Sequence, residues 1–271
     1  MDPSMSERYG PWALIAGGSE GIGLEFARQL ASHGINLLLL ARREQPLLDA
    51  QAAISEEFSV EVRIAALDLS SPDLPERLAE LTAGLEFGML IYNAGASHGL
   101  ELFHDAPLHR ALQMIALNCA GPATLCHALG GAMRARRRGG IILLSSLSAF
   151  CGSAYIATYA ASKAFDIGFA ESLWAELKPY GVDVLSLVIG ATDTPAMSRA
   201  GADMSAVPSL TSAQVAEEGL ARLGKGPIHV VGELGQMLAE AARGGDREEL
   251  IDNMSSAAAS MFGMTYPPEP G

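Results

Sequence analysis

The chain has 271 residues, 49% of them hydrophobic and 18% charged, a composition typical of a globular protein with a sizeable core. Its formal net charge of −13 argues against nucleic acid or an anionic membrane surface as the main partner. The three cysteines, Cys119, Cys126 and Cys151, show no paired spacing, so we expect no disulfide framework, no metal site and a reducing, cytoplasmic location. The sequence contains no apolar run long enough for membrane insertion.

Short apolar runs alternate with amphipathic segments along the chain. The apolar runs predict buried strands over residues 12–16, 36–41, 60–67, 89–92, 140–146, 182–189 and 228–231. Helices are predicted over residues 24–33, 45–58, 71–82, 107–136, 161–178 and 211–223, followed by mixed helical sequence over 233–261. Because the strands are continuously apolar, we expect an α/β fold with a Rossmann-type, doubly wound parallel sheet covered by helices on both faces.

No linker, repeat or low-complexity segment interrupts this alternation, so we interpret residues 1–271 as a single domain. The core of that domain is expected over residues 9–231. Within it, residues 191–223 are expected to form a substrate-binding loop and helix, and residues 232–271 a C-terminal extension. The long helix over 107–136 is expected to be interrupted near Gly121 and Pro122.

Ligands of such a sheet bind beyond the carboxyl ends of its strands. The residues that follow six of the predicted strands are Gly17, Arg42, Asp68, Asn93, Ser146 and Gly190. After the first strand, glycines at 17, 21 and 23 allow a tight turn and let a pyrophosphate approach the start of a helix. The turn therefore predicts a dinucleotide site with contacts from Gly17, Ser19, Glu20, Gly21, Ile22 and Gly23.

The end of the second strand distinguishes the two nicotinamide cofactors. An acidic residue there would accept a hydrogen bond from the ribose 2′-hydroxyl, whereas this chain has Arg42 and Arg43. A guanidinium offers a forked, charge-assisted grip on a 2′-phosphate. The sequence therefore favours NADP(H), with NAD(H) as the alternative. The competing interpretation is that both arginines are solvated at the start of a helix.

Tyr159 and Lys163 are four residues apart, which places them on one face of a helix. A phenol is a weak acid at neutral pH, and a nearby ammonium favours its phenolate form. The pair could therefore exchange a proton with a substrate oxygen. This spacing is common by chance, so the interpretation depends on the serine-ended strand before it and on the glycine turn.

These motifs together resemble the short-chain dehydrogenase/reductase family in its compact single-domain branch. The motifs that support this resemblance are Gly-x-x-x-Gly-x-Gly starting at Gly17, Asn-Ala-Gly starting at Asn93, and Tyr-x-x-x-Lys starting at Tyr159. The resemblance implies that Tyr159 is the acid/base, that Lys163 holds the nicotinamide ribose, and that Ser146 contacts the substrate carbonyl. It further implies that Asn118 holds a water beside Lys163. Implied cofactor contacts are Asp68, Leu69, Asn93, Ala94, Gly95, Tyr159, Lys163, Gly190, Thr192 and Thr194.

The chain departs from the family pattern at three positions. Ala16 stands where the family has a threonine that supports the glycine turn, and Tyr92 replaces the first asparagine of its Asn-Asn-Ala-Gly motif. Ile189 replaces the proline that usually precedes Gly190. None of these changes removes a catalytic group, but the first two leave open how the turn is supported.

The substrate wall is expected to be mostly apolar. Its candidate residues are Ala96, Leu100, Leu102, Phe103, Ser148, Phe150, Cys151, Tyr155 and Met197. This wall favours a bulky hydrophobic ketone or alcohol, steroid-like or aromatic. The alternatives are a 3-ketoacyl-carrier or acyl-CoA reductase, with the basic run over residues 134–138 as a landing patch, and a non-catalytic NADP(H)-binding regulator. The helices over 108–129 and 165–177 are apolar enough for a homodimer or homotetramer.

Overall fold

The computed structural model describes residues 4–95, 99–206 and 208–268. Its main sheet has seven parallel strands in the order β3-β2-β1-β4-β5-β6-β9. They are β1 (Trp12–Ala16), β2 (Asn36–Ala41), β3 (Val62–Ala66), β4 (Phe87–Tyr92), β5 (Gly139–Ser146), β6 (Val182–Ile189) and β9 (Ile228–Val230). Because the strand order runs outward from β1 in both directions, the predicted doubly wound α/β fold is confirmed.

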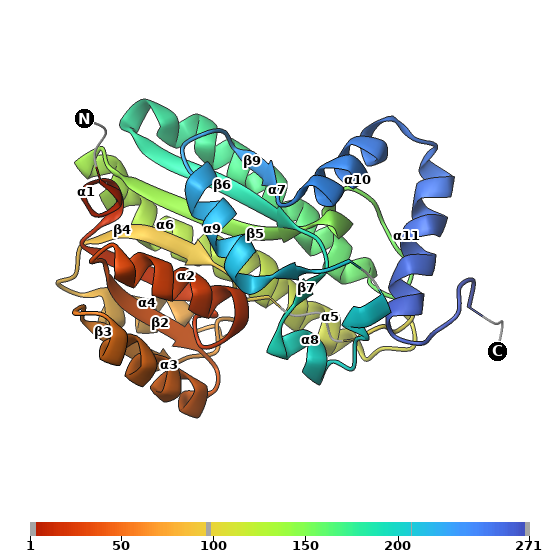
Figure 1. The fold of residues 1–271 in the computed structure, drawn as a ribbon, viewed down its shortest axis with the longest axis horizontal. Coiled ribbons are helices and arrows are strands. Elements are labelled where there is room, and N and C mark those ends of the chain that lie inside the picture. Colours follow the sequence, from red (N-terminus) through yellow and green to blue (C-terminus); the bar gives the residue numbers. More distant parts are fainter. Residues whose placement is uncertain (1–3, 96–98, 207, 269–271) are drawn as a thin grey trace.

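Helices cover both faces of this sheet (Figure 1). One face packs against α2 (Gly21–Ser32), α3 (Glu44–Glu57) and α9 (Ser212–Arg222), and the other against α4 (Leu74–Thr82), α6 (Gly121–Arg136) and α7 (Ala157–Leu177). Successive side chains of β1 point to opposite faces of the sheet. Ile15 packs into the core on the first face, and Leu14 packs into the core on the second. Both side chains are fully buried, as expected for a continuously apolar central strand.

The helical stretch over 107–136 is interrupted earlier than the sequence predicts. Helix α5 (Leu108–Ile115) runs into a π-helical turn over Ala116–Ala120, and α6 follows. The buried Tyr92 hydroxyl donates a 2.6 Å hydrogen bond to the carbonyl of Leu117 within this turn. Pro122 is tolerated because it stands in the first turn of α6. The widened turn carries Asn118, and π-turns inside α-helices occur frequently at functional sites.

Helix α7 begins at Ala157, four residues before the predicted start at Ala161. The earlier start places Tyr159 inside the helix, one turn before Lys163. The two side chains therefore share one face of a regular helix. A short helix, α1 (Met5–Tyr9), which the sequence did not predict, packs against β4 and β5.

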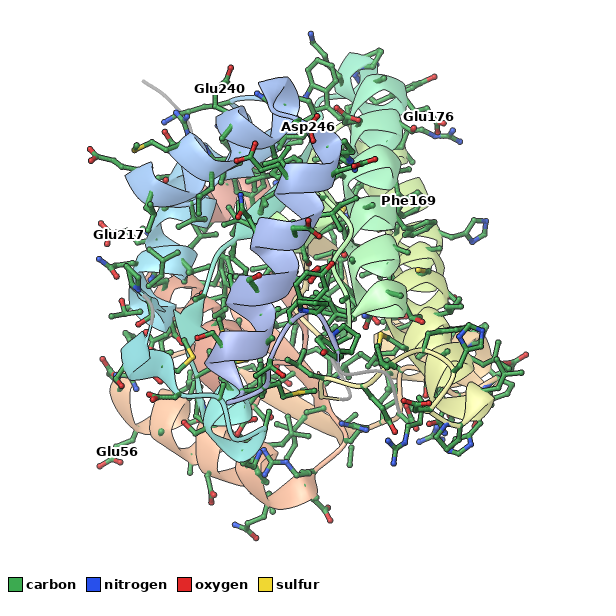
Figure 2. The ribbon with its side chains drawn as sticks, turned by 90° about the vertical axis from the view of Figure 1, so that its right-hand side faces the viewer. Glu56, Phe169, Glu176, Glu217, Glu240 and Asp246 are labelled. Carbon is green, nitrogen blue, oxygen red and sulfur yellow. The ribbon has the colours of Figure 1, made fainter. Side chains whose placement is uncertain are left out.

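The segments after β6 lie beside the carboxyl ends of the strands. They comprise β7 (Thr192–Asp193), α8 (Pro195–Arg199), a 3-10 turn (Met204–Ala206), β8 (Leu210–Thr211), α10 (Glu233–Gly244) and α11 (Arg247–Met261). Figure 2 shows α11 in front of the sheet, with Asp246 beside its first turn. Two hydrogen bonds attach α11 to neighbouring loops: the Asp203 N–H donates to the Met261 carbonyl and the Ala154 N–H to the Ser255 hydroxyl. Across the described residues, we find no helix with the length and apolarity that crossing a membrane requires.

Candidate active site

The glycine turn between β1 and α2 has the shape of a phosphate cradle. Gly17 and Gly21 adopt positive φ angles of 81° and 55°, which favour glycine. A Cβ at Gly23 would collide with the Gly17 carbonyl and lie 2.8 Å from the Asn93 amide nitrogen. Glu20 makes no side-chain capping bond, so the first N–H groups of α2 are left for an anion. The turn therefore fits the pyrophosphate of a dinucleotide.

Residues directly after β4 support this turn, and they show how the turn is held although position 16 is an alanine. The Asn93 side-chain amide donates to the Gly17 carbonyl at 2.9 Å. The backbone N–H groups of Asn93 and Ala94 both donate to the Ala16 carbonyl, at 3.0 and 2.8 Å. Main-chain bonds and one amide therefore hold the turn without a hydroxyl at position 16.

The end of β2 carries a charge cluster rather than two free cations. Arg43 and Arg199, the latter in α8, both donate to the Glu20 carboxylate, with Nη–Oε2 distances of 2.7 and 2.9 Å. The hydrogen bond from Arg199 is the largest effect on the pKa of Glu20; burial opposes it, and with the hydrogen bond from Arg43 the pKa is held below its usual value. Arg42 is exposed, and its charge acts on the Asp68 carboxylate. Arg42 is thus the better placed arginine for an incoming phosphate.

Asp68 and Leu69 follow β3 on the same edge. Burial raises the pKa of Asp68, but hydrogen bonds from the Ser70 backbone and hydroxyl, at 2.9 and 2.7 Å, outweigh it and the pKa is lowered. Asp68 is therefore an anion at neutral pH, suited to accept from an amino group. The Leu69 side chain is buried in the core against the sheet.

Residues 190–194 bring the chain back over the glycine turn. Thr192 is buried and its hydroxyl donates to the Gly190 carbonyl at 3.1 Å. A Cβ at Gly21 would lie 3.5 Å from the Thr194 side chain, and that side chain caps α8. Of the predicted cofactor residues in this segment, Thr194 therefore lies directly against the turn.

Helix α7 is tied to the end of β5 by two hydrogen bonds around Lys163. The Ser145 hydroxyl donates to the Lys163 carbonyl at 2.7 Å, and the Lys163 ammonium donates to the Leu144 carbonyl at 2.7 Å. The ammonium also pairs with the Asp166 carboxylate at 3.1 Å. Sequence reasoning missed Asp166, although an acidic residue three positions after Lys163 is a recognisable helical pairing signal.

Asn118 of the π-helical turn joins the same cluster. Its side-chain amide donates to the Ser162 hydroxyl at 2.9 Å, and that hydroxyl donates to the Tyr159 carbonyl at 2.8 Å. A Cβ at Gly95 would lie 3.3 Å from the Lys163 nitrogen and 3.6 Å from the Asn118 oxygen. The structure therefore gathers Asn118, Lys163 and the backbone of Tyr159 from separate elements into one cluster.

Ser146 ends β5, directly after the Ser145 that anchors α7. It is half-buried, and its hydroxyl accepts a 3.3 Å hydrogen bond from the Ser148 N–H as it caps a short 3-10 turn. The buried Ser148 hydroxyl has no hydrogen-bond partner among the described residues. Ser146 is therefore held at the end of β5 by its cap of this turn.

A cavity of about 280 Å³ opens beside Tyr159, between the starts of α5 and α7. Its lining comprises Gly99, Glu101, Phe103, His104, Ala106, Pro107, Leu108, Arg110, Ala111, Met114, Tyr155, Ile156, Ala157, Thr158 and Tyr159. Most of these side chains are apolar, and Glu101 and Arg110 form an ion pair with a 2.9 Å Nη1–Oε2 distance.

The predicted substrate wall and this cavity overlap only in part. Tyr155 and Phe103 line the cavity. The other described candidates are not part of its lining: Leu100, Leu102, Ser148, Phe150, Cys151 and Met197. Ala96 falls outside the described residues. Sequence reasoning missed the side of the cavity built by α5, because the amphipathic pattern of that helix does not show which neighbour its residues meet. No cluster of three or more metal-ligating side chains occurs among the described residues.

Known proteins resemble this chain in both sequence and structure. A family model described as short chain dehydrogenase matches residues 11–205. A 7β-hydroxysteroid dehydrogenase of Clostridium sardiniense is 33% identical over 247 residues, which cover 90% of this chain and 94% of that protein. A very-long-chain 3-oxoacyl-CoA reductase of Podospora anserina is 37% identical over 196 residues. That match covers 71% of this chain but only 57% of the reductase.

A solved 7β-hydroxysteroid dehydrogenase structure superposes with a TM-score of 0.86 at 28% identity, covering 93% of this chain and 99% of that one. A short-chain dehydrogenase from Sphingobium yanoikuyae in complex with NADPH superposes with a TM-score of 0.77 at 26% identity. In that comparison, 87% of this chain and 94% of the other are covered.

A substitution in the glycine turn tests whether this turn binds the pyrophosphate of the cofactor. We expect Gly23→Ala to weaken NADPH binding at least about tenfold, because the added methyl group forces the turn and Asn93 apart. Fluorescence titration with NADPH measures the affinity. The control is Gly131→Ala in α6, where an added Cβ meets no atom within 4 Å. It should bind NADPH normally and gain about 0.5–1 kcal/mol of stability. Unchanged binding by Gly23→Ala would contradict the assigned cradle.

Proposed function

Because the chain belongs to the short-chain dehydrogenase/reductase family, we propose that it interconverts a bulky hydrophobic ketone and its secondary alcohol with NADP(H). One observation carries this proposal: Tyr159 lines an apolar cavity while Lys163, one turn later on α7, is anchored to β5 and clustered with Asn118. An acid/base group at a cavity wall with a fixed cation behind it is the arrangement that proton transfer to a carbonyl oxygen requires.

The proposed cofactor site spans the edge of the sheet. The glycine turn binds the pyrophosphate, Asp68 contacts the adenine, and Arg42 contacts the 2′-phosphate. The remaining contacts are Asn93, Ala94, Gly95, Lys163, Gly190, Thr192 and Thr194. When bound, the dinucleotide supplies or accepts the hydride.

In the reduction direction, Tyr159 donates its proton to the substrate carbonyl oxygen. Ser146 donates a hydrogen bond to the same oxygen and shares the charge that develops there. Lys163 stabilises the phenolate left behind and contacts the nicotinamide ribose, and Asn118 holds a water beside it. In oxidation the same groups act in reverse, with the phenolate as the base.

A steroid-like substrate is favoured over an acyl thioester. The apolar cavity suits a rigid hydrophobic ring system, and the 7β-hydroxysteroid dehydrogenase is matched over nearly its whole length. The acyl-CoA reductases leave much of their own length unmatched.

The basic run also gives the acyl-carrier alternative little support. Arg136 donates to the Phe87 carbonyl, Arg137 to the Pro179 carbonyl, and Arg138 pairs with Glu86. Arg134 lies over the Tyr180 ring. These arginines are therefore engaged within the protein, so they stabilise the fold around the end of α6 and are poorly available as a landing patch.

We also propose a homodimer or homotetramer that pairs through α5 and α7. Leu108, Leu112 and Ile115 of α5 are 66%, 55% and 46% exposed, and Phe165 of α7 is 37% exposed. Figure 2 labels Phe169 on α7, and its ring stacks on that of Phe165 with centroids 5.2 Å apart. A continuous apolar surface of this kind is typical of a subunit interface.

The remaining proposals concern location and organisation. Cys119, Cys126 and Cys151 are all unpaired, which suits a reducing cytoplasm. We propose that the chain is one domain. Within it, residues 191–223 form the substrate-binding loop and helix, and residues 232–271 form the C-terminal extension.

A panel of ketones, scored by NADPH oxidation, tests the reaction and its proton donor. We expect turnover of bulky steroid-like ketones, and a loss of at least about 100-fold in kcat for Tyr159→Phe with NADPH binding retained. Tyr180→Phe is the matched control, since Tyr180 lies on the surface against Arg134. NADPH binding without turnover of any ketone would instead favour the non-catalytic regulator.

The cofactor preference rests on Arg42. We expect Arg42→Asp to weaken NADPH binding about 10- to 100-fold while NADH binding changes little, because one charge-assisted contact to the phosphate is lost. The control for the change in net charge is Arg77→Asp, because Arg77 is an exposed residue of α4. Equal affinities of the parent and Arg42→Asp for both dinucleotides would refute the assignment.

The subunit interface is tested by placing a charge on it. Leu112→Glu should convert the oligomer to a monomer, because an unpaired carboxylate in an apolar interface is costly. Light scattering coupled to gel filtration measures the mass. Leu48→Glu on α3, where the parent side chain is 42% exposed, should leave the oligomer intact. If the parent protein is itself a monomer in solution, the proposed interface is wrong.

A further inference from the structure

Asp166 is a buried carboxylate directly behind the catalytic cluster. It is 2% exposed on α7, and its Oδ2 accepts from the Lys163 ammonium at 3.1 Å. Its other oxygen, Oδ1, is buried and has no hydrogen-bond partner among the described residues. A half-satisfied buried carboxylate is costly, so its presence requires an explanation.

The surroundings of Asp166 supply little else that balances its charge. Burial raises the pKa of Asp166 above its usual value, and the charge and hydrogen bond of Lys163 offset only part of this rise. The other titratable groups facing it are Tyr92 on β4, Cys119 in the π-helical turn and Cys126 on α6. Burial raises the pKa of each of these, and the Asp166 charge raises it further. They are therefore neutral, and Lys163 is the cation that acts on Asp166 within the described chain.

Stability alone does not account for this pair. A buried ion pair is often no more stabilising than apolar side chains of similar volume. Aspartate is also a weak helix former in a helix interior. Phe169 and Leu173, one and two turns later on α7, pack against the apolar core, so an apolar residue at position 166 would be compatible with this layer. The carboxylate is better explained by what it does to Lys163.

We propose that Asp166 is a positioning residue of the proton-transfer site, which holds the Lys163 ammonium and offsets its charge. This inference rests on the proposed roles of Tyr159 and Lys163. The ammonium has two anchors, the Leu144 carbonyl and the Asp166 carboxylate, which together fix its direction. Because the carboxylate cancels part of the cation's field, its removal should strengthen the stabilisation of a Tyr159 phenolate by Lys163.

The variant Asp166→Asn removes the charge and preserves the shape. We expect the Tyr159 phenol to titrate about one pH unit lower, because the Lys163 cation is no longer offset. The measurement is an ultraviolet titration that detects phenolate in the protein without substrate or cofactor. The titration curve of Tyr159→Phe is subtracted, so that the difference reports Tyr159. With a ketone that is turned over, kcat should fall about tenfold, since the ammonium loses one anchor, and the pH profile should move in the same direction.

Two further variants separate this role from a structural one. Glu171→Gln removes an exposed carboxylate from the same helix and should move neither the titration nor the profile. Asp166→Glu restores the charge and should return the phenol titration toward that of the parent. If Asp166→Asn does not fold, Asp166→Leu replaces it with the same expected shift.

A lowered melting temperature with an unmoved phenol titration would overturn the proposal, since it would make Asp166 merely structural. The titration needs no turnover. A chain that reduces no ketone but shows the shift would therefore contradict the proposed function while leaving the link between Asp166 and Tyr159 intact.

Discussion

The attachment of α7 to the end of β5 is the constraint on which the site depends. Ser145 binds the main chain of Lys163, and the Lys163 side chain binds the main chain of Leu144. The helix and the strand are thereby fixed together at the height of the glycine turn. Tyr159 lies one turn earlier on the same helix, and this attachment therefore positions it at the cavity wall.

The cofactor side is organised by charge as much as by shape. Glu20 of the glycine turn pairs with Arg43, which precedes α3, and with Arg199 from α8, so one carboxylate joins the two walls of the proposed dinucleotide site. A phosphate arriving beside Arg42 meets a cluster that is already partly neutralised. The proposed preference for NADP(H) therefore depends on Glu20 as well as on the arginines, because the Glu20 carboxylate neutralises part of their charge.

Sequence patterns predicted the sheet well, because continuously apolar runs such as Asn36–Ala41 leave little choice of structure or burial. They also predicted that the residues after the strands would meet, since parallel strands end at one edge. They did not predict the pairing of Asp166 or the cavity beside α5. Both depend on which elements pack together in three dimensions, and no periodicity along one element records that.

The π-helical turn shows how one departure from the family pattern is accommodated. Tyr92 reaches the Leu117 carbonyl only because Gly121 has no side chain, as a Cβ there would collide with the Tyr92 hydroxyl. The two positions are thus coupled sterically. Any side chain at position 121 would displace the Tyr92 hydroxyl from the Leu117 carbonyl, so this hydrogen bond beside Asn118 depends on the glycine.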